Sequence, residues 1–126
     1  MARILVVEDS PIETHQYVNL LAEHGHQVLT AATGDDGLEI ARSEQPDMIL
    51  MDVVLPGMNG FQVTRQITRN AQTKHIPVIM ISSKNQPADI VWGERQGACG
   101  YLVKPVADKQ LVAKVNEVLA VASEAS

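Results

Sequence analysis

Three short segments of the sequence consist only of Val, Ile, Leu and Met. They are residues 4–7 (ILVV), 48–51 (MILM) and 78–81 (VIMI), and none of them alternates apolar with polar residues. Strands that carry apolar side chains on both faces are buried on both faces, which is typical of a parallel sheet covered by helices. These three runs therefore predict the central strands of such a sheet.

Weaker strand signals and helical periodicities alternate with the central runs along the chain. Two short strands are predicted at 27–31 and 101–103, each after a glycine-containing turn. Helices are predicted between the strands. The first starts at Ser10-Pro11 and has Ile12 on its apolar face. The fourth is predicted near 87–96, and the last at 108–122 with Asp108 as its N-cap. This order of elements predicts the α/β class, with five parallel strands joined by right-handed crossovers.

Size and charge restrict the function classes that are open to this chain. The 126 residues fit one domain, and we expect no separate output domain. The net charge of −5 argues against binding to nucleic acid or anionic lipid, so proteins are the expected partners. No signal peptide or membrane-spanning run is predicted, and the lone Cys99, expected to be a small buried residue, favours a reducing cytoplasm.

The residues that follow the predicted strands carry most of the chemistry in the sequence. In an open α/β sheet the binding crevice lies at the carboxyl ends of the strands. Four predicted strands end in polar residues: Glu8 and Asp9, Asp52, Ser82 and Ser83, and Lys104. Each has a bland interpretation as a cap or a solvated loop residue, but the coincidence at four strand ends favours a shared site. His15, His24, His26 and His75 show no metal-ligand spacing and are expected to be solvated.

Three carboxylates at one site would repel one another unless a hard cation lay among them, and Mg²⁺ is the natural candidate. The ammonium of Lys104 and the hydroxyl of Ser82 would then contact phosphate oxygens. The carboxylate of Asp52 would act as the nucleophile and form an acyl phosphate. The residues at the strand ends thus predict a phosphoryl-transfer site.

The segments that carry these residues resemble the CheY-like receiver family of two-component response regulators over essentially the whole chain. The matching segments are VEDS (7–10), DVVLPGMNG (52–60), PVIMISSK (77–84) and GACGYLVKP (97–105). The resemblance implies a flavodoxin-like doubly wound sheet with strand order 2-1-3-4-5. Within the family, residues 91–98 and the segment through 23–28 look most like PilH-type regulators of type IV pilus twitching motility.

The resemblance also implies roles for single residues. Asp52 would accept phosphate from a histidine kinase, and Lys104 would contact the phosphoryl group. Mg²⁺ would be held by Asp9, Asp52 and the backbone carbonyl of Val54, with Glu8, one methylene longer than the commoner Asp, binding directly or through water. Ser82 and Tyr101 would form the switch, while loop geometry is assigned to Pro56, Gly60 and Pro105, with a cis Lys104–Pro105 bond.

The implied protein is a switch and not an enzyme acting on other substrates. Phosphorylation would remodel the face formed by the helix near 87–96, the strand 101–103 and the helix 108–122, and a downstream protein would bind there. The protein would be a monomer or a weak, phosphorylation-dependent dimer. Two alternatives stay open: a phosphate sink for a shared kinase, and an unphosphorylated pseudo-receiver that only binds partners.

Two enzyme-like or cofactor-binding families with similar folds are disfavoured by single residues. A haloacid-dehalogenase-type phosphatase needs a second acid two residues after its nucleophile, where this chain has Val54. A flavodoxin needs a phosphate-cradling loop after its first strand, where Glu8 and Asp9 would repel the flavin phosphate.

Overall fold

The computed structural model describes residues 1–125, in which strands and helices alternate from end to end. The elements are β1 (Arg3–Val7), α1 (Pro11–Glu23), β2 (Gln27–Ala31), α2 (Gly34–Glu44), β3 (Met48–Asp52), α3 (Gly60–Arg69), β4 (Val78–Ser82), α4 (Pro87–Arg95), β5 (Gly100–Val103) and α5 (Asp108–Ala125). The predicted α/β class is confirmed. The predicted strand positions agree with the structure to within one residue.

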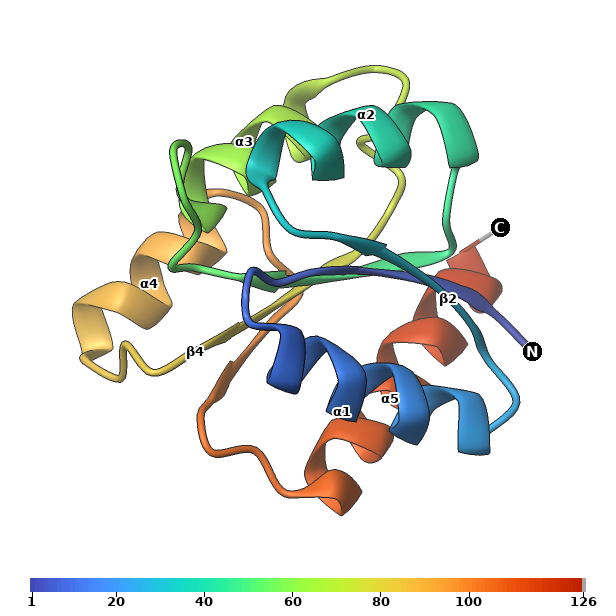
Figure 1. Cartoon of the computed structure of the whole chain (residues 1–126). Helices are drawn as coiled ribbons and strands as arrows, with labels where there is room; N and C mark the ends of the chain where they lie inside the picture. Colours follow the sequence, from blue (N-terminus) through green and yellow to red (C-terminus); the bar gives the residue numbers. More distant parts are fainter. Residues whose placement is uncertain (126) are drawn as a thin grey trace.

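The strands form one parallel sheet in the order β2-β1-β3-β4-β5, as the family resemblance implied. The three continuous apolar runs are the three inner strands, β1, β3 and β4. In Figure 1 α2 and α3 lie above this sheet, and α1 and α5 lie below it. The inner strands are therefore covered on both faces, which explains why they contain no polar alternation.

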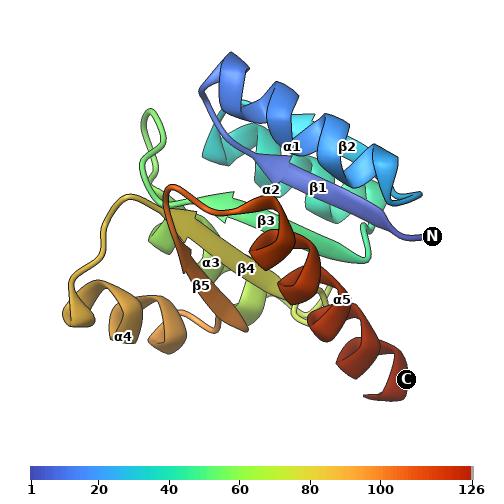
Figure 2. The same cartoon turned by 90° about the horizontal axis from the view of Figure 1, so that it is seen from below.

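Two apolar layers separate the sheet from its helices. Side chains that alternate along each inner strand enter opposite layers, because successive residues of a strand point to opposite faces. On β1, Leu5 and Val7 pack toward α2 and α3, whereas Ile4 and Val6 pack toward α1 and α5. Figure 2, seen from below, shows α1 and α5 lying across the second of these faces.

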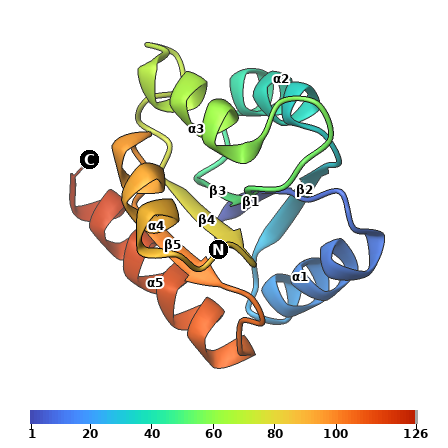
Figure 3. The same ribbon diagram turned by 90° about the vertical axis from the view of Figure 1, so that its left-hand side faces the viewer.

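Helix α4 lies beside the edge strand β5, apart from the pair α2 and α3, as Figure 3 shows. A side chain at Gly93 would come within 3.1 Å of the Tyr101 ring and 3.0 Å of the Met80 sulfur. The glycine thus lets α4 pack closely on the ring of Tyr101. Val91 and Trp92 of the same helix are each 46% exposed.

Three expectations from the sequence were wrong. Ile12 is 73% exposed, because it lies in the first turn of α1, beyond the end of the sheet. Cys99 is exposed; it immediately precedes β5, and its backbone N–H donates to the Val78 carbonyl. Asp108 is the first helical residue of α5 and not its cap; the Leu111 N–H bonds the carbonyl of Ala107 instead.

No helix in the described part of the chain combines the length and the apolar character that crossing a membrane requires.

Candidate functional site

The register of the sheet brings the polar residues at the strand ends to one level. Val7 pairs with Met51, so Glu8 and Asp52 follow side by side, and Ser82 pairs with Val103, immediately before Lys104. The two-residue period of a strand sends Asp52 and Ser82 to different faces of the sheet, since Leu50 and Ile81 share one layer. The acids and the lysine therefore form one group, with Ser82 on the other side.

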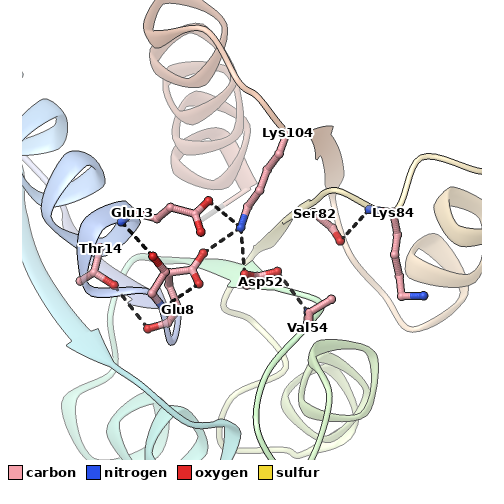
Figure 4. A network of polar contacts seen from close by, with 9 residues as sticks. Glu8, Glu13, Thr14, Asp52, Val54, Ser82, Lys84 and Lys104 are labelled. Atoms are coloured by element: carbon pink, nitrogen blue, oxygen red, sulfur yellow. Dashed lines mark hydrogen bonds and ion pairs between the residues drawn. The ribbon is translucent and has the colours of Figure 1, made fainter.

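Lys104 lies at the centre of that group (Figure 4). Its Nζ is 2.9 Å from Glu8 Oε1, 2.9 Å from Asp52 Oδ2 and 2.8 Å from Glu13 Oε1. Asp52 and Glu8 are buried, with 6% and 3% of their surfaces exposed. One ammonium group thus faces three carboxylates, and the group carries an excess of negative charge when all four residues are ionised.

Glu13 was not predicted from the sequence. It occupies the third position after Ser10 in a Ser-x-x-Glu pattern, which ordinarily predicts a glutamate that bonds back to the cap. The Ser10 Oγ does accept the Glu13 N–H, at 3.3 Å, but the Ser10 N–H donates to Glu8 Oε2 instead. The Glu13 carboxylate is therefore available to Lys104. The sequence does contain a signal for this, because both Glu8 and Glu13 lie close enough to Ser10 to accept its N–H, and only one of them can do so.

The Glu8 backbone is also fixed, because the Thr14 hydroxyl donates to its carbonyl oxygen at 3.3 Å. Burial raises the pKa of the Glu8 carboxyl to about 7, and the neighbouring Asp52 carboxylate adds to the rise. Burial alone would lower the pKa of Lys104, but its close contacts with Glu13, Asp52 and Glu8 outweigh burial and raise that pKa. The lysine is therefore a permanent cation, whereas Glu8 changes charge near neutral pH.

The loop after β3 holds Asp52 in place. The Val54 N–H donates to Asp52 Oδ1 at 3.1 Å, and the Gly60 N–H donates to the Val53 carbonyl at 2.8 Å. A Cβ atom at Gly60 would lie 2.1 Å from the Asp52 carbonyl oxygen. Only glycine allows α3 to start this close to the end of β3. The turn before it contains the exposed Pro56, followed by Gly57 at a φ of +71°.

Ser82 and Tyr101 lie on the α4 side of the site. Ser82 is fully buried, and its Oγ accepts the Lys84 N–H at 3.1 Å. The Tyr101 hydroxyl donates to the Lys84 carbonyl at 2.7 Å. Both side chains are thus connected to the same residue of the β4–α4 loop. The Lys104–Pro105 peptide that leads out of β5 is cis, as the resemblance implied.

The donor atoms of this site fit a hard divalent cation. Oxygens of Glu8, Glu13 and Asp52 lie within 4.8 Å of one another, and carboxylate oxygens are the ligands that Mg²⁺ prefers. Asp9, a predicted ligand, lies exposed on the adjoining loop and is not one of these three residues. The structure therefore brings Glu8, Asp52 and Lys104 together as predicted, adds Glu13, and leaves Asp9 at the rim.

Residues 4–116 match the sequence profile of the response regulator receiver domain. Protein PilH of Pseudomonas aeruginosa is 55% identical over 120 residues, covering 95% of this chain and 99% of that protein. The transcriptional regulatory protein AfsQ1 of Streptomyces coelicolor is 41% identical over 116 residues, covering 92% of this chain but only 50% of its own length. The chain thus matches nearly the whole of the first relative and about half of the second.

The fold is shared with solved structures. A CheY-like response regulator receiver domain protein from Methanospirillum hungatei superposes with a TM-score of 0.94 at 26% identity, covering 100% of this chain and 99% of that one. The predicted family and the predicted likeness to PilH-type proteins are both confirmed by these matches.

Proposed function

The chain belongs to the response regulator receiver family, and from that premise we propose that it is a phosphorylation switch whose acceptor is Asp52. The observation that carries the proposal is the contact between the buried Asp52 carboxylate and Lys104 at the carboxyl end of the sheet. A nucleophilic carboxylate beside a fixed cation is the arrangement that phosphoryl transfer requires.

The transfer step is a displacement at phosphorus. A carboxylate oxygen of Asp52 attacks the phosphoryl group of a phosphohistidine on a histidine kinase. The P–N bond breaks, and its electron pair leaves with the imidazole nitrogen, which takes up a proton. Lys104 then balances the charge of the phosphoryl oxygens.

Receiver domains bind Mg²⁺ at an acidic site, and we assign that site here to Asp52, Asp9 and the Val54 carbonyl, with Glu8 bound directly or through water. The ion would supply neutralisation of the phosphoryl oxygens. The protein's own residues do the rest: Gly60 and the Val54 N–H orient the nucleophile, and burial of Asp52 limits its access to water.

The switch proposed for this chain starts from the contacts on Lys84. Ser82 would turn from the Lys84 N–H toward a phosphoryl oxygen, and the Tyr101 hydroxyl would leave the Lys84 carbonyl as its ring moves inward. Because that ring packs on Gly93, its movement would alter the face formed by α4, β5 and α5. A downstream protein would bind that face, where Val91 and Trp92 are exposed.

Labelling with acetyl phosphate tests the acceptor. With Mg²⁺ and radiolabelled acetyl phosphate, we expect the wild type and the Asp36→Asn control to be labelled and Asp52→Asn to remain unlabelled. Asp36 is an exposed acid in the first turn of α2, so its substitution makes the same chemical change away from the site. Labelling of Asp52→Asn at the wild-type rate would show that the acceptor is another residue.

For the pathway, we propose that the protein acts in the cytoplasm as one receiver unit in type IV pilus twitching motility. The 55% identity to PilH over nearly its whole length supports this. A Pseudomonas aeruginosa strain that lacks its PilH should regain normal twitching zones with the wild type and the Asp36→Asn control, but not with Asp52→Asn. Failure of the wild type to restore the zones, at matched protein levels, would contradict this pathway.

A further inference from the structure

Three carboxylates surround the ammonium of Lys104 in the arrangement described here. Two of its three N–H donors are hydrogen-bonded to Glu8 and Asp52, and Glu13 Oε1 lies 2.8 Å from Nζ as an ion pair. An incoming phosphoryl oxygen therefore competes with these carboxylates for Lys104. The rate of phosphorylation then depends on which carboxylate leaves, and how readily.

The three carboxylates differ in what they lose by leaving. Asp52 itself becomes the acyl phosphate, so its place on Lys104 passes to the transferred group. The Glu8 side chain is 2% exposed, so it would become an unpaired charge inside the protein if it left. The Glu13 side chain is 34% exposed and extends from the surface helix α1 (Figure 4). It can turn into water, where its charge is solvated, so it is the partner that can be displaced most easily.

No other contact described for the first turn of α1 needs the Glu13 carboxylate. The Ser10 N–H, which a glutamate at this position would ordinarily bond, is already bonded to Glu8. The Glu13 backbone N–H keeps its bond to Ser10 Oγ whichever way the carboxylate points. The side chain can therefore leave Lys104 without disturbing the start of the helix.

We propose that Glu13 is a positioning residue that occupies Lys104 in the unphosphorylated protein and is displaced by the phosphoryl group, so that it limits the rate of phosphorylation of Asp52. This inference rests on the proposed function for its kinetic consequence. The hold of Glu13 on Lys104 does not depend on that function and can be measured by itself.

Two substitutions separate the hold on Lys104 from the charge of Glu13. Glu13→Gln keeps the length of the side chain but removes the charge, whereas Glu13→Asp keeps the charge but is one methylene shorter, so we expect it to hold Nζ less closely. Glu23→Gln, at the exposed far end of the same helix, is the matched control.

The first measurement is the rate at which Lys104 reacts with an amine-reactive reagent without Mg²⁺, followed by mass spectrometry. We expect a rise of about two- to fivefold in both Glu13 variants, the range for loss of one partly exposed ion pair, and no change in the control.

The second measurement is phosphorylation by acetyl phosphate in saturating Mg²⁺, together with the Mg²⁺ dissociation constant from calorimetry. Both Glu13 variants should be phosphorylated about two to five times faster than the wild type. Glu13→Gln should bind Mg²⁺ more weakly because it removes a negative charge close to the assigned ligands Glu8 and Asp52, whereas Glu13→Asp keeps that charge and should bind Mg²⁺ like the wild type. A purely structural role for Glu13 would instead slow phosphorylation in both variants.

The outcomes distinguish the inference from its premise. Unchanged or slower phosphorylation of both variants, with a wild type that is phosphorylated, would overturn the role of Glu13. If no protein, including the wild type, is phosphorylated, the proposed function fails, and the lysine reactivity still shows whether Glu13 occupies Lys104. Unchanged lysine reactivity in both variants overturns the inference by itself.

Discussion

Replacing Asp52 by Asn should stabilise the metal-free protein, although it removes the proposed phosphate acceptor. Three carboxylates contact one ammonium group, and two of the three are buried. Neutralising Asp52 loses its attraction to Lys104, but it also ends two repulsions and the burial of a charge. The side-chain oxygen of Asn can still accept the Val54 N–H that Asp52 accepts now.

The balance of these terms follows from the distances. At an effective dielectric constant of about 20, the attraction across 2.9 Å between Asp52 and Lys104 amounts to about 6 kcal/mol. Repulsion across 4.8 Å or less amounts to at least about 3.5 kcal/mol for the buried Glu8, and to less for Glu13 because water screens it. These terms nearly cancel, so relief from burying the Asp52 charge decides the sign, and we expect a net gain of about 1–2 kcal/mol.

The gain should depend on pH because Glu8 changes charge. Its pKa is raised to about 7, so between the usual value of 4.5 and 7 the native state binds more protons than the unfolded state. Wild-type stability contributed by Glu8 is therefore present at low pH and lost as pH rises through 7. Asp52→Asn removes one of the causes that raise the pKa of Glu8, so the variant loses less stability than the wild type as Glu8 ionises. The stability gained by Asp52→Asn should therefore be larger at pH 8 than at pH 6.

The assay is urea unfolding of the wild type, Asp52→Asn and the Asp36→Asn control at pH 6 and pH 8, with EDTA and again with Mg²⁺. The gain of Asp52→Asn should shrink in Mg²⁺, because only the wild type keeps the full set of carboxylates for the ion. A variant that is less stable than the wild type in EDTA at pH 8 would refute the charge balance. Equal gains at both pH values would refute the part assigned to Glu8.

Three further predictions concern other contacts. Gly60→Ala should lower the free energy of unfolding by about 3 kcal/mol or more, because its Cβ would lie 2.1 Å from a backbone oxygen. In urea it should lose more than Gly25→Ala, which meets no atom within 4 Å and costs only the roughly 1–2 kcal/mol of a left-handed backbone, at a φ of +83°. Lys104→Met should destabilise the metal-free protein by about 3 kcal/mol by leaving buried carboxylates unpaired, and added Mg²⁺ should restore most of the loss in the same assay. His26 Nδ1 accepts the Ala2 N–H, and burial lowers the pKa of His26, so its contribution to stability is lost as pH falls below about 6.5. His26→Asn keeps a hydrogen-bond acceptor but does not titrate, so its melting temperature should depend less on pH in this range. A pH dependence equal to that of the wild type would contradict this prediction.

The fold could be predicted from the sequence because its strongest signals are all of one kind. Continuous apolar runs mark strands buried on both faces, and their alternation with helical periods leaves few arrangements other than a parallel sheet. The errors lie where an element passes beyond the core. Ile12 has the spacing of a core residue but precedes the part of α1 that covers the sheet, and Cys99 lies where the chain has only begun to enter β5.

The site was predicted where strand ends decide it and missed where side-chain competition decides it. Glu8, Asp52 and Lys104 follow their strands directly, so the sheet register alone brings them together. The position of Glu13 depends on which acid accepts the Ser10 N–H; here Glu8 does, and its backbone carbonyl also accepts the Thr14 hydroxyl. A pattern of residue types contains both possible partners and cannot rank them.

The same carboxylates serve two cations, and this links the two halves of the proposed chemistry. Glu8 and Asp52 contact Lys104 now, and they are also among the acids assigned to Mg²⁺. Binding of Mg²⁺ by these carboxylates should weaken their ion pairs with Lys104. Because such coupling is reciprocal, the ion pairs with Lys104 should weaken Mg²⁺ binding by the same factor. Release of Lys104 toward a phosphoryl group should therefore accompany occupation of the acidic site, and Glu13, the most exposed of the three carboxylates, can leave Lys104 by turning into water.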